Sequence, residues 1–487
     1  MTISKAKTFR NVIYTTLTKG TTIVCIAVTA GVVARNLSPS DYGVVGFALI
    51  IMNFLFHFSD MGVFTAAIQR RTLDQQSLRS AFTLRVMLSS GAFVAAQLVA
   101  PLAHHLFEHP AITNVVRLAS FNYLATMIGF MSFIMLTREH NFRALVIPGV
   151  AGSVARTILA VTLVLLGWKY WAVVLADLGA NLTSSVAMQL VRKIPIRFEV
   201  DWADFREFLR IGTPSIGGGL LVFLILNMDN FLVGLKMGSA KLGYYALAFS
   251  WGAFICGFLS DTVNSVMLPA FSAMQDDTAA MRRWYLKSVD MAGFVAVVAN
   301  TALLANGRFF LVTFLGKGTG KWLPVTTPLK ILCIYGILRV ITEPLTNCIV
   351  ARGRTKLLLG SGALAGVAEL LLILLVLPTG RIDLIAAAVL VAYATQAIIY
   401  LPFLRKEFSI GFGDLAAKLW PVIPALLGGC AITSLLPEWL GGTLFTLGCR
   451  GLFTAAVTAL IHGLCTRFRC FQEAGGMISQ NLDRVLA

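Results

Sequence analysis

The stretch LSPSDYG, Leu37 to Gly43, lies between two long apolar runs and determines how the chain is organised. A weaker echo, MGSAKLG at Met237 to Gly243, also lies between two apolar runs, and the offset from Gly43 to Gly243 is 200 positions. Each stretch has the form of a short turn between hydrophobic helices, although few other residues match at this offset. Two membrane lobes built from one ancestral unit predict a transporter, because such repeats usually enclose a substrate site between them.

The composition predicts that lipid is the main solvent of the chain. Hydrophobic residues make up 57% of the 487 and charged residues 13%, whereas soluble proteins carry about 25% charge. Apolar stretches of about 20 residues recur from end to end, and a bilayer requires each of them to be a helix. We predict an all-α integral membrane protein with about 14 transmembrane helices, in two pseudo-symmetric six-helix lobes plus two C-terminal helices. The predicted spans are 12–34, 43–67, 80–103, 114–137, 144–167, 170–191, 211–235, 243–268, 288–306, 323–351, 357–378, 384–404, 419–437 and 443–464.

The distribution of Lys and Arg predicts the orientation of these spans. With the N-terminus in the cytoplasm, the cytoplasmic segments hold 25 basic residues and the opposite side holds 8. The positive-inside rule therefore favours an even number of spans, with both termini in the cytoplasm. The net charge of +17 is mainly a topology signal, so it does not indicate a nucleic-acid partner. The first apolar run is too long for a signal-peptide core and is expected to be a retained helix.

A second echo supports a division into lobes. The span pairs at 144–191 and 357–404 both end in two basic residues, and the offset of 213 between them superimposes Gly167 on Gly380. We predict an N-lobe over 1–193 (TM1–6), a cytoplasmic interfacial linker helix over 194–210, a C-lobe over 211–406 (TM7–12), and TM13–14 with a cytoplasmic tail over 407–487. The linker contains DWADFREFLR at 201–210, whose apolar residues share one helical face, as in a helix lying on a membrane surface. Parallel repeats of six spans predict a central cleft that can open to either side.

Several chemistries lack their motifs in this sequence. No G-x-x-x-x-G-K-[ST] loop is present, so no nucleotide-driven motor is encoded. The eight cysteines are scattered without a C-x-x-C, and His104, His105 and His109 lack a supporting ligand set, so no metal site is predicted. No connection between spans is long enough for the large periplasmic loop that a membrane polymerase or ligase would expose. An enzyme is therefore disfavoured.

The first two spans carry motifs that resemble those of a known family. The pattern R-x-L-x-P-x-D-Y-G, from Arg35 to Gly43, is similar to the opening signature of polysaccharide transporters of the Wzx type. The acidic-glycine segment Ser59-Asp60-Met61-Gly62, followed by the basic exit Ile68-Gln69-Arg70, is similar as well. These transporters belong to the multidrug/oligosaccharidyl-lipid/polysaccharide (MOP) exporter superfamily.

The resemblance implies a flippase that acts without chemistry on its substrate. It would translocate undecaprenyl-pyrophosphate-linked oligosaccharide repeat units across the bacterial cytoplasmic (inner) membrane by alternating access, for exopolysaccharide, capsule, lipopolysaccharide or O-antigen biosynthesis. Its partners would be that substrate, membrane lipid, and a polysaccharide polymerase and chain-length regulator, with no nucleic acid. The alternative is an ion-coupled exporter of small amphipathic cations from the same superfamily. Such an exporter would favour an acidic cavity, whereas the basic groups within the spans favour an anionic head.

Three basic residues within the spans are candidates for binding the substrate: Lys19, Arg156 and Arg339. Lys19 lies about 10 Å from the cytoplasmic end of the first span, where an ammonium group could meet a pyrophosphate or could instead reach back to the interface. Arg156 and Asp177 lie at matching depths on neighbouring spans, so they are either a salt bridge or part of a cavity lining. Arg339 can be neutralised by Glu343 on the next turn of its own span. Arg85 is close enough to the start of its span to snorkel to the interface, and it ranks below these three.

Four carboxylates within the spans are candidates for ion coupling or for lining a cavity: Asp177, Asp229, Asp261 and Glu369. A carboxylate inside a membrane can carry a proton or bind Na⁺, or it can be a hydrogen-bonded structural acid. Coupling to H⁺ or Na⁺ is thus open, and no other cofactor is expected. Asp60 belongs to the acidic-glycine motif, which favours packing at a helix end.

Substitution of Lys19 tests the proposed contact with pyrophosphate. We expect Lys19→Ala to abolish or strongly reduce polysaccharide export at normal protein abundance, because the substitution removes the charge. Lys19→Arg should retain a substantial part of export, since it keeps the charge and changes only its geometry. Export is measured as surface polysaccharide, with protein abundance followed by immunoblotting. Full export by a normally abundant Lys19→Ala variant would remove Lys19 from the site.

Overall fold

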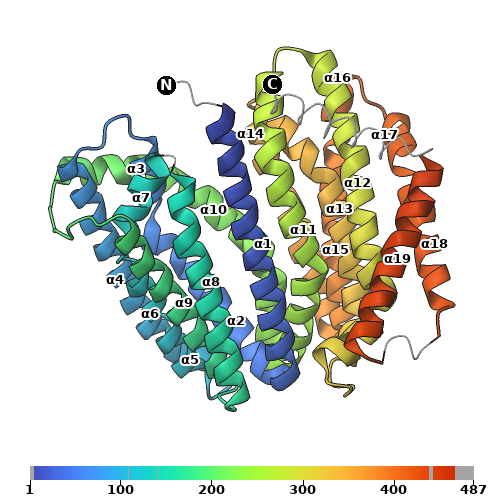
Figure 1. Ribbon diagram of the computed structural model, residues 1–487, viewed down its shortest axis with the longest axis horizontal. Helices are drawn as coiled ribbons and strands as arrows, with labels where there is room; N and C mark the ends of the chain where they lie inside the picture. Colours follow the sequence, from blue (N-terminus) through green and yellow to red (C-terminus); the bar gives the residue numbers. More distant parts are fainter. Residues whose placement is uncertain (1–4, 108, 140, 438–441, 467–487) are drawn as a thin grey trace. The chain divides into compact units, whose positions relative to one another are not determined.

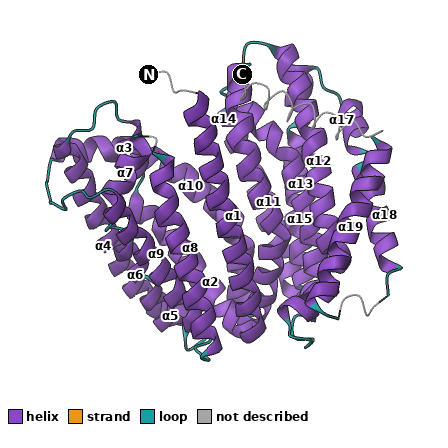
Figure 2. Cartoon of the chain, in the orientation of Figure 1, coloured by secondary structure: helices purple, strands orange, loops and turns teal. Residues whose placement is uncertain are grey.

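The computed structural model describes residues 5–107, 109–139, 141–437 and 442–466. Within these ranges the side chains of residues 5–19 and 254–266, and of Phe142, Ser215 and Pro269, are not described. All regular secondary structure in the described ranges is helical (Figures 1 and 2). The chain divides into two compact units, Met1–Gly243 and Tyr244–Ala487.

The helices confirm the predicted class of fold. Eleven helices in the described part of the chain are long and apolar enough to cross a membrane, and a bent pair raises the number to twelve if it forms one span. The predicted spans 12–34 and 243–268 fall in helices α1 and α11, which contain residues whose side chains lie outside this description. The count of fourteen therefore stays a prediction.

The first unit is a bundle in which the consecutive helices α8 and α9 pack side by side. Helix α1 packs on the other side of α8, and α2 packs against α4 and α10. The helices of this unit are α1 (Lys5–Asn36), α2 (Pro39–Asp60), α3 (Val63–Gln69), α4 (Gln75–Phe107), α5 (Ile112–Ala119), α6 (Phe121–Ala125), α7 (Phe130–Arg138), α8 (Phe142–Leu165), α9 (Tyr170–Val191) and α10 (Trp202–Met237).

The LSPSDYG stretch forms the turn between α1 and α2, as predicted. Ser38 caps α2: its hydroxyl accepts the N–H of Asp41 at 3.1 Å, and the Asp41 carboxylate accepts the N–H of Ser38 at 3.2 Å. Pro39 occupies the first turn of the helix, where its missing N–H costs nothing. This capping box satisfies amide groups that would otherwise be orphaned at the start of the helix.

The two echoed stretches contact one another through their glycines. A Cβ on Gly43 would overlap the backbone carbonyl of Ser239, and a Cβ on Gly243 would overlap the carbonyl of Pro39. Since Ser239 and Pro39 are themselves 200 positions apart, these two contacts are reciprocal, as across a local two-fold axis. The Ser40 and Ser239 hydroxyls also lie 2.6 Å apart. The glycines shared by the two stretches thus have a physical reason, which is the close approach of two backbones.

The second echo is also visible in the backbone. Gly167 and Gly380 both have positive φ, at 82° and 65°, in the turns that follow α8 and α14. A left-handed conformation of this kind favours glycine. The offset of 213 therefore relates two turns of the same local geometry.

The acidic-glycine motif forms a left-handed turn at the end of α2. Met61 and Gly62 have φ values of 42° and 68°, and a Cβ on Gly62 would overlap the backbone of Gly212 in α10. The basic exit that follows is structural. Arg70 forms ion pairs with Asp204 and Glu207 of α10, while Arg138 donates to the carbonyls of Ala67 and Arg70 at the end of α3.

The segment predicted as an interfacial linker helix has a different form. Residues 193–201 are not helical, and DWADFREFLR begins the continuous helix α10, which extends to Met237. Phe205 and Phe208 are buried in a core shared with α3, α4 and α7, whereas Trp202 is 72% exposed. The apolar face of this segment is thus largely covered by protein. The division between the two units lies at Gly243, beyond the predicted lobe boundary.

The second unit is a bundle in which α12 packs against α13, α18 and α19. Its core includes Phe271, Tyr285, Ile337 and Phe408. The helices of this part of the chain are α11 (Ser239–Ala273), α12 (Thr278–Phe309), α13 (Thr326–Ala351), α14 (Thr355–Val376), α15 (Ile382–Ile399), α16 (Leu401–Phe408), α17 (Phe412–Leu419), α18 (Val422–Ser434) and α19 (Leu444–Cys465), with short segments η1 (Phe310–Leu315), η2 (Leu323–Val325) and η3 (Leu377–Thr379).

The reciprocal glycine contact predicts a stability difference. We expect Gly43→Ala and Gly243→Ala each to lower the thermal unfolding temperature of the purified protein, because a backbone carbonyl occupies the place of the new methyl group. Gly91→Ala is the matched control, since no atom lies within 4 Å of a Cβ there and alanine favours a helix over glycine. Equal unfolding temperatures for all three variants would contradict the close contact.

Candidate functional site

A broken helix lies inside the first unit. Helices α5 and α6 over Ile112–Ala125 are followed, after a break at 126–129, by α7 over Phe130–Arg138, with a bend of 50°. Gly129 lets the break approach α9 closely, because a Cβ there would lie 2.8 Å from the carbonyl oxygen of Ser185. At membrane depth, irregular backbone is tolerated only where protein buries it or where it lines a cavity.

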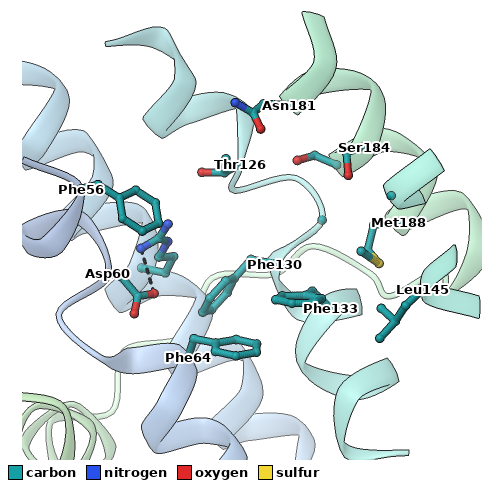
Figure 3. Close-up of a pocket in the computed structure, with 14 residues that line it drawn as sticks. Phe56, Asp60, Phe64, Thr126, Phe130, Phe133, Leu145, Asn181, Ser184 and Met188 are labelled. Carbon is teal, nitrogen blue, oxygen red and sulfur yellow. Dashed lines mark hydrogen bonds and ion pairs between the residues drawn. The ribbon is translucent and has the colours of Figure 1, made fainter. Parts of the chain in front are cut away.

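The break lines a cavity of about 510 Å³, which we call the Arg85 cavity (Figure 3). A neighbouring cavity of about 410 Å³, the Asp177 cavity, shares Phe56, Thr126 and Asn181 with it. The Arg85 cavity is lined by Phe56, Asp60, Phe64, Arg85, Thr126, Gly129, Phe130, Phe133, Leu145, Gly149, Asn181, Ser184, Ser185 and Met188. The Asp177 cavity is lined by Val45, Ala48, Leu49, Met52, Asn53, Phe56, Ala119, Asn122, Tyr123, Thr126, Val174, Asp177 and Asn181.

An ion pair between α2 and α4 lies in the wall of the Arg85 cavity. The Arg85 Nη1 atom is 2.9 Å from Asp60 Oδ1, and 5% of the Arg85 side chain is exposed. The guanidinium also lies against the rings of Phe56 and Phe130, at 5.7 and 5.5 Å from their centroids. Such contacts stabilise a cation where water is excluded. The Arg85 Nε atom is buried and has no hydrogen-bond partner.

The aromatic and the neutral polar side chains that line the Arg85 cavity lie on different sides of it. Figure 3 shows Phe64, Phe130 and Phe133 grouped on one side, with Thr126, Asn181 and Ser184 opposite them. The rings of Phe64 and Phe133 are stacked, with centroids 4.7 Å apart and an interplanar angle of 10°. The Asn181 amide donates to Asn122 Oδ1 at 2.8 Å, which fixes one polar group where the two cavities meet.

The predicted pairing of Arg156 with Asp177 is confirmed. The Arg156 Nε atom on α8 is 2.6 Å from Asp177 Oδ1 on α9. Asp177 lines the cavity named after it, and Asn181 lies one turn further along the same helix. Because this bond engages the guanidinium of Arg156, the structure favours a structural role for Arg156 over a role in binding the substrate.

The other basic candidates are separated from these cavities or lie outside the description. Lys19 is in α1, but its side chain lies outside the described residues. Arg339 is in α13 of the second unit, where its Nη1 atom donates to the Tyr335 hydroxyl at 3.3 Å. Arg339 is not among the residues that line the Arg85 or the Asp177 cavity.

Of the remaining acidic candidates, Asp229 and Glu369 are not among the residues that line either cavity. Asp229 in α10 is 1% exposed, and its carboxylate accepts from the backbone N–H and side-chain amide of Asn230 at 2.7 and 3.1 Å. Glu369 in α14 is 7% exposed. Asp261 is in α11, where its side chain is outside the described residues.

Two groups of residues were missed or misplaced by sequence reasoning. Sequence reasoning ranks Arg85 low because it could snorkel to the interface, and it favours a helix-end packing role for Asp60, but the two form a buried pair across α2 and α4. Arg450 was not singled out at all. It is buried in α19, where it donates to Asn306 at 2.8 Å and to the carbonyl of Thr433 at 3.0 Å. The available signal was a charge inside an apolar run, which predicts a partner without saying which one.

The described residues contain no group of three or more His, Cys, Asp or Glu side chains that could hold a metal ion. Of the histidines that cluster near the end of α4, His104 has its Nδ1 atom 3.2 Å from the carbonyl oxygen of His109. The Arg85 cavity in the first unit is lined by an ion pair, neutral polar groups and aromatic rings. Such a lining can bind a molecule that has both polar and apolar faces.

A profile of the polysaccharide biosynthesis protein family matches residues 32–327, more than half of the 487 residues. The chain belongs to this family. The match confirms the resemblance drawn from the first two spans. Its range covers both cavities and the Asp60–Arg85 pair.

Curated relatives are distant in sequence. The chain is 22% identical to lipopolysaccharide biosynthesis protein WzxC of Escherichia coli (strain K12) over 334 residues, which is 67% of this chain and 66% of the relative. It is 24% identical to teichuronic acid biosynthesis protein TuaB of Bacillus subtilis (strain 168) over 311 residues, 61% of this chain and 62% of the relative. The chain thus matches less than two thirds of the length of each relative.

Solved structures share the fold. A structure described as lipid II flippase MurJ in an inward closed conformation has a TM-score of 0.74 at 14% identity, covering 94% of this chain and 99% of that one. An inward-facing multidrug resistance MATE family transporter of the MOP superfamily has a TM-score of 0.65 at 16% identity, covering 79% and 94%. At these levels of identity the likenesses establish the fold, which is that of a multi-helix membrane bundle.

The Asp60–Arg85 pair predicts a stability effect. We expect Arg85→Met to destabilise the protein by about 3–5 kcal/mol, because Asp60 is left as an unpaired carboxylate among the helices. The double variant Asp60→Leu with Arg85→Met should recover part of that loss, since no lone charge remains. The measurement is thermal unfolding of the purified variants.

Arg381→Met is the matched control for this experiment. Arg381 also has a carboxylate partner, Asp383 at 2.6 Å, but 64% of its side chain is exposed, so the loss should stay within about 1 kcal/mol. A double variant less stable than Arg85→Met alone would show that the pair does not couple as described.

Proposed function

We propose that this protein is a flippase for lipid-linked oligosaccharides. It moves undecaprenyl-pyrophosphate-linked repeat units from the inner to the outer leaflet of the bacterial cytoplasmic membrane, for synthesis of exopolysaccharide, capsule or O-antigen. Membership of the polysaccharide biosynthesis protein family is the observation that carries this proposal. The fold shared with a lipid II flippase supports it.

The internal chemistry of the first unit is consistent with transport of a polar molecule. The walls of the two cavities combine hydroxyl and amide groups with one Asp–Arg pair, within a bundle whose helices are apolar enough for a membrane. Polar groups in such a bundle are expensive and mark substrate pathways. The protein would bind and release its substrate by alternating access, with no covalent step and hence no enzymatic activity.

The energy source belongs to the same proposal. We propose coupling to a gradient of H⁺ or Na⁺, with Asp229, Asp261 and Glu369 as the candidate carriers. The burial of Asp229 and Glu369 supports their inclusion. Both termini are proposed to lie in the cytoplasm, and a polysaccharide polymerase and a chain-length regulator are the proposed partners.

Deletion of the gene tests the function. We expect the deletion strain to lose surface polysaccharide and to accumulate lipid-linked repeat units that are inaccessible from the outer side, because synthesis continues without translocation. A plasmid copy should reverse both effects. The measurements are surface polysaccharide by immunoblotting and the susceptibility of lipid-linked sugar to an added glycosidase in intact spheroplasts.

Normal polysaccharide in the deletion strain would contradict the flippase proposal. If that strain instead became more sensitive to organic cations, the small-cation exporter of the same superfamily would be the better assignment. Reconstitution of the purified protein with lipid-linked repeat units would separate direct translocation from an indirect effect on synthesis.

A further inference from the structure

The Arg85 cavity has an uncommon lining for the interior of a membrane bundle. On one side, Phe133 keeps 39% of its surface exposed, and its ring is held flat against that of Phe64. Stacked rings present a broad face with negative potential, against which the C–H groups on one face of a sugar ring can pack. The aromatic side therefore offers a platform for a flat, partly apolar ring.

The opposite side offers neutral hydrogen-bonding groups. Thr126, Asn181 and Ser184 come from the helix break and from α9 (Figure 3). The Thr126 hydroxyl donates to the carbonyl of Tyr123 at 3.1 Å and keeps its capacity to accept. The Asn181 amide, which gives one N–H to Asn122, and the Ser184 hydroxyl can each donate and accept, so the three groups match the hydroxyls around the edge of a sugar. An aromatic face opposite a neutral polar wall suits a saccharide.

The Arg85–Asp60 pair adds directional groups to this lining. Arg85 is nine-tenths buried or more, and its Nη1 atom lies 2.9 Å from Asp60 Oδ1. The Asp60 side chain keeps 23% of its surface exposed, so its carboxylate can accept a hydrogen bond from a ligand hydroxyl in the cavity.

The charge of the lining disfavours a pyrophosphate at the same place. The Arg85 cavity is lined by one acid and one base, and these two already neutralise each other at 2.9 Å. In the adjoining cavity, the lining carboxylate Asp177 is bonded to Arg156. A diphosphate entering this region would meet carboxylates without any cation to spare, so an uncharged ligand is favoured.

The volume of the region suits more than one sugar ring. The Arg85 cavity holds about 510 Å³ and adjoins the 410 Å³ Asp177 cavity through shared lining residues. Ligand pockets commonly have volumes of about 300–1,000 Å³. We propose that the Arg85 cavity is a saccharide subsite, which binds an uncharged sugar of the transported oligosaccharide apart from its pyrophosphate. This inference rests on the proposed function and assigns the selection of the sugar to the first unit.

Filling the cavity tests the inference. Ser184→Phe places a ring in the lining, while Val186→Phe places the same ring two residues away on α9, at an exposed position that does not line the cavity. Phe133→Leu is a second variant, which removes the aromatic face but keeps an apolar side chain. The full-length protein is purified into lipid nanodiscs, and thermal unfolding shows that each variant is folded.

Two probes distinguish a sugar from a pyrophosphate. The first is the free oligosaccharide released by mild acid from lipid-linked repeat units of the host strain, and the second is undecaprenyl pyrophosphate without sugar. Saturation-transfer NMR with irradiation of the aromatic protons reports binding of the oligosaccharide to the protein, and the variants assign that binding to the cavity. We expect transfer to the sugar-ring protons of the free oligosaccharide in the wild type and in Val186→Phe. Binding should be about tenfold weaker or worse in Ser184→Phe and Phe133→Leu.

The outcomes separate this inference from the proposed function. No saturation transfer in the wild type would overturn the saccharide subsite, as would unchanged binding in folded Ser184→Phe and Phe133→Leu. Displacement of the oligosaccharide by undecaprenyl pyrophosphate would also overturn it, because the cavity would then hold the charged group. None of these results would affect the flippase proposal, which fails only if the deletion strain exports and flips its repeat units normally.

Discussion

Pairing of polar groups within the protein is the constraint on which this structure depends, because lipid offers no hydrogen bonds. Arg85 is paired with the Asp60 carboxylate on a neighbouring helix, and Arg156 is paired with Asp177 in the same way. Arg450 is paired differently, with an amide and the carbonyls at the end of α18. Each solution fixes the relation of one helix to another. The buried charges therefore specify which helices are neighbours.

Small residues supply the close contacts that this pairing requires. Gly129 lets the broken helix approach α9, and Gly152 of α8 would place a Cβ 3.0 Å from that of Ser184. Without a hydrophobic force between helices in lipid, such close packing is a main source of association. The reciprocal contacts of Gly43 and Gly243 extend this principle to the two echoed turns. The two stretches thus keep the same residue, glycine, at the positions where their backbones meet, whereas few other residues match between them.

If the chain is the proposed flippase, the distribution of charge in the first unit assigns the sugar and the pyrophosphate of the substrate to different places. The cavities of the first unit are lined by aromatic, amide and hydroxyl groups, with their charges neutralised in pairs. A pyrophosphate needs unneutralised cations, and the structure provides none in these walls. In the proposed function, the pyrophosphate would therefore be bound by basic residues other than those in these walls, for which Lys19 and Arg339 are the predicted candidates. Separate sites for a constant diphosphate and a variable sugar would let the sugar preference change without loss of the shared contact.

The sequence by itself determined the class of fold, the family and the places where two turns had to be alike. Hydropathy and the need to pair every backbone group in lipid dictate helices, and the motifs from Arg35 to Arg70 lie within the span that the family profile matches. Depth along two adjacent spans was enough to predict the Arg156–Asp177 bond, because neighbouring helices in sequence were also neighbours in space. Only the tertiary structure decided that Asp60 pairs with Arg85 and that three phenylalanines face three neutral polar groups around a broken helix. A hydropathy pattern records that a side chain is apolar or charged. It does not record which face of a helix meets which neighbour, since that depends on close packing between segments far apart in the chain.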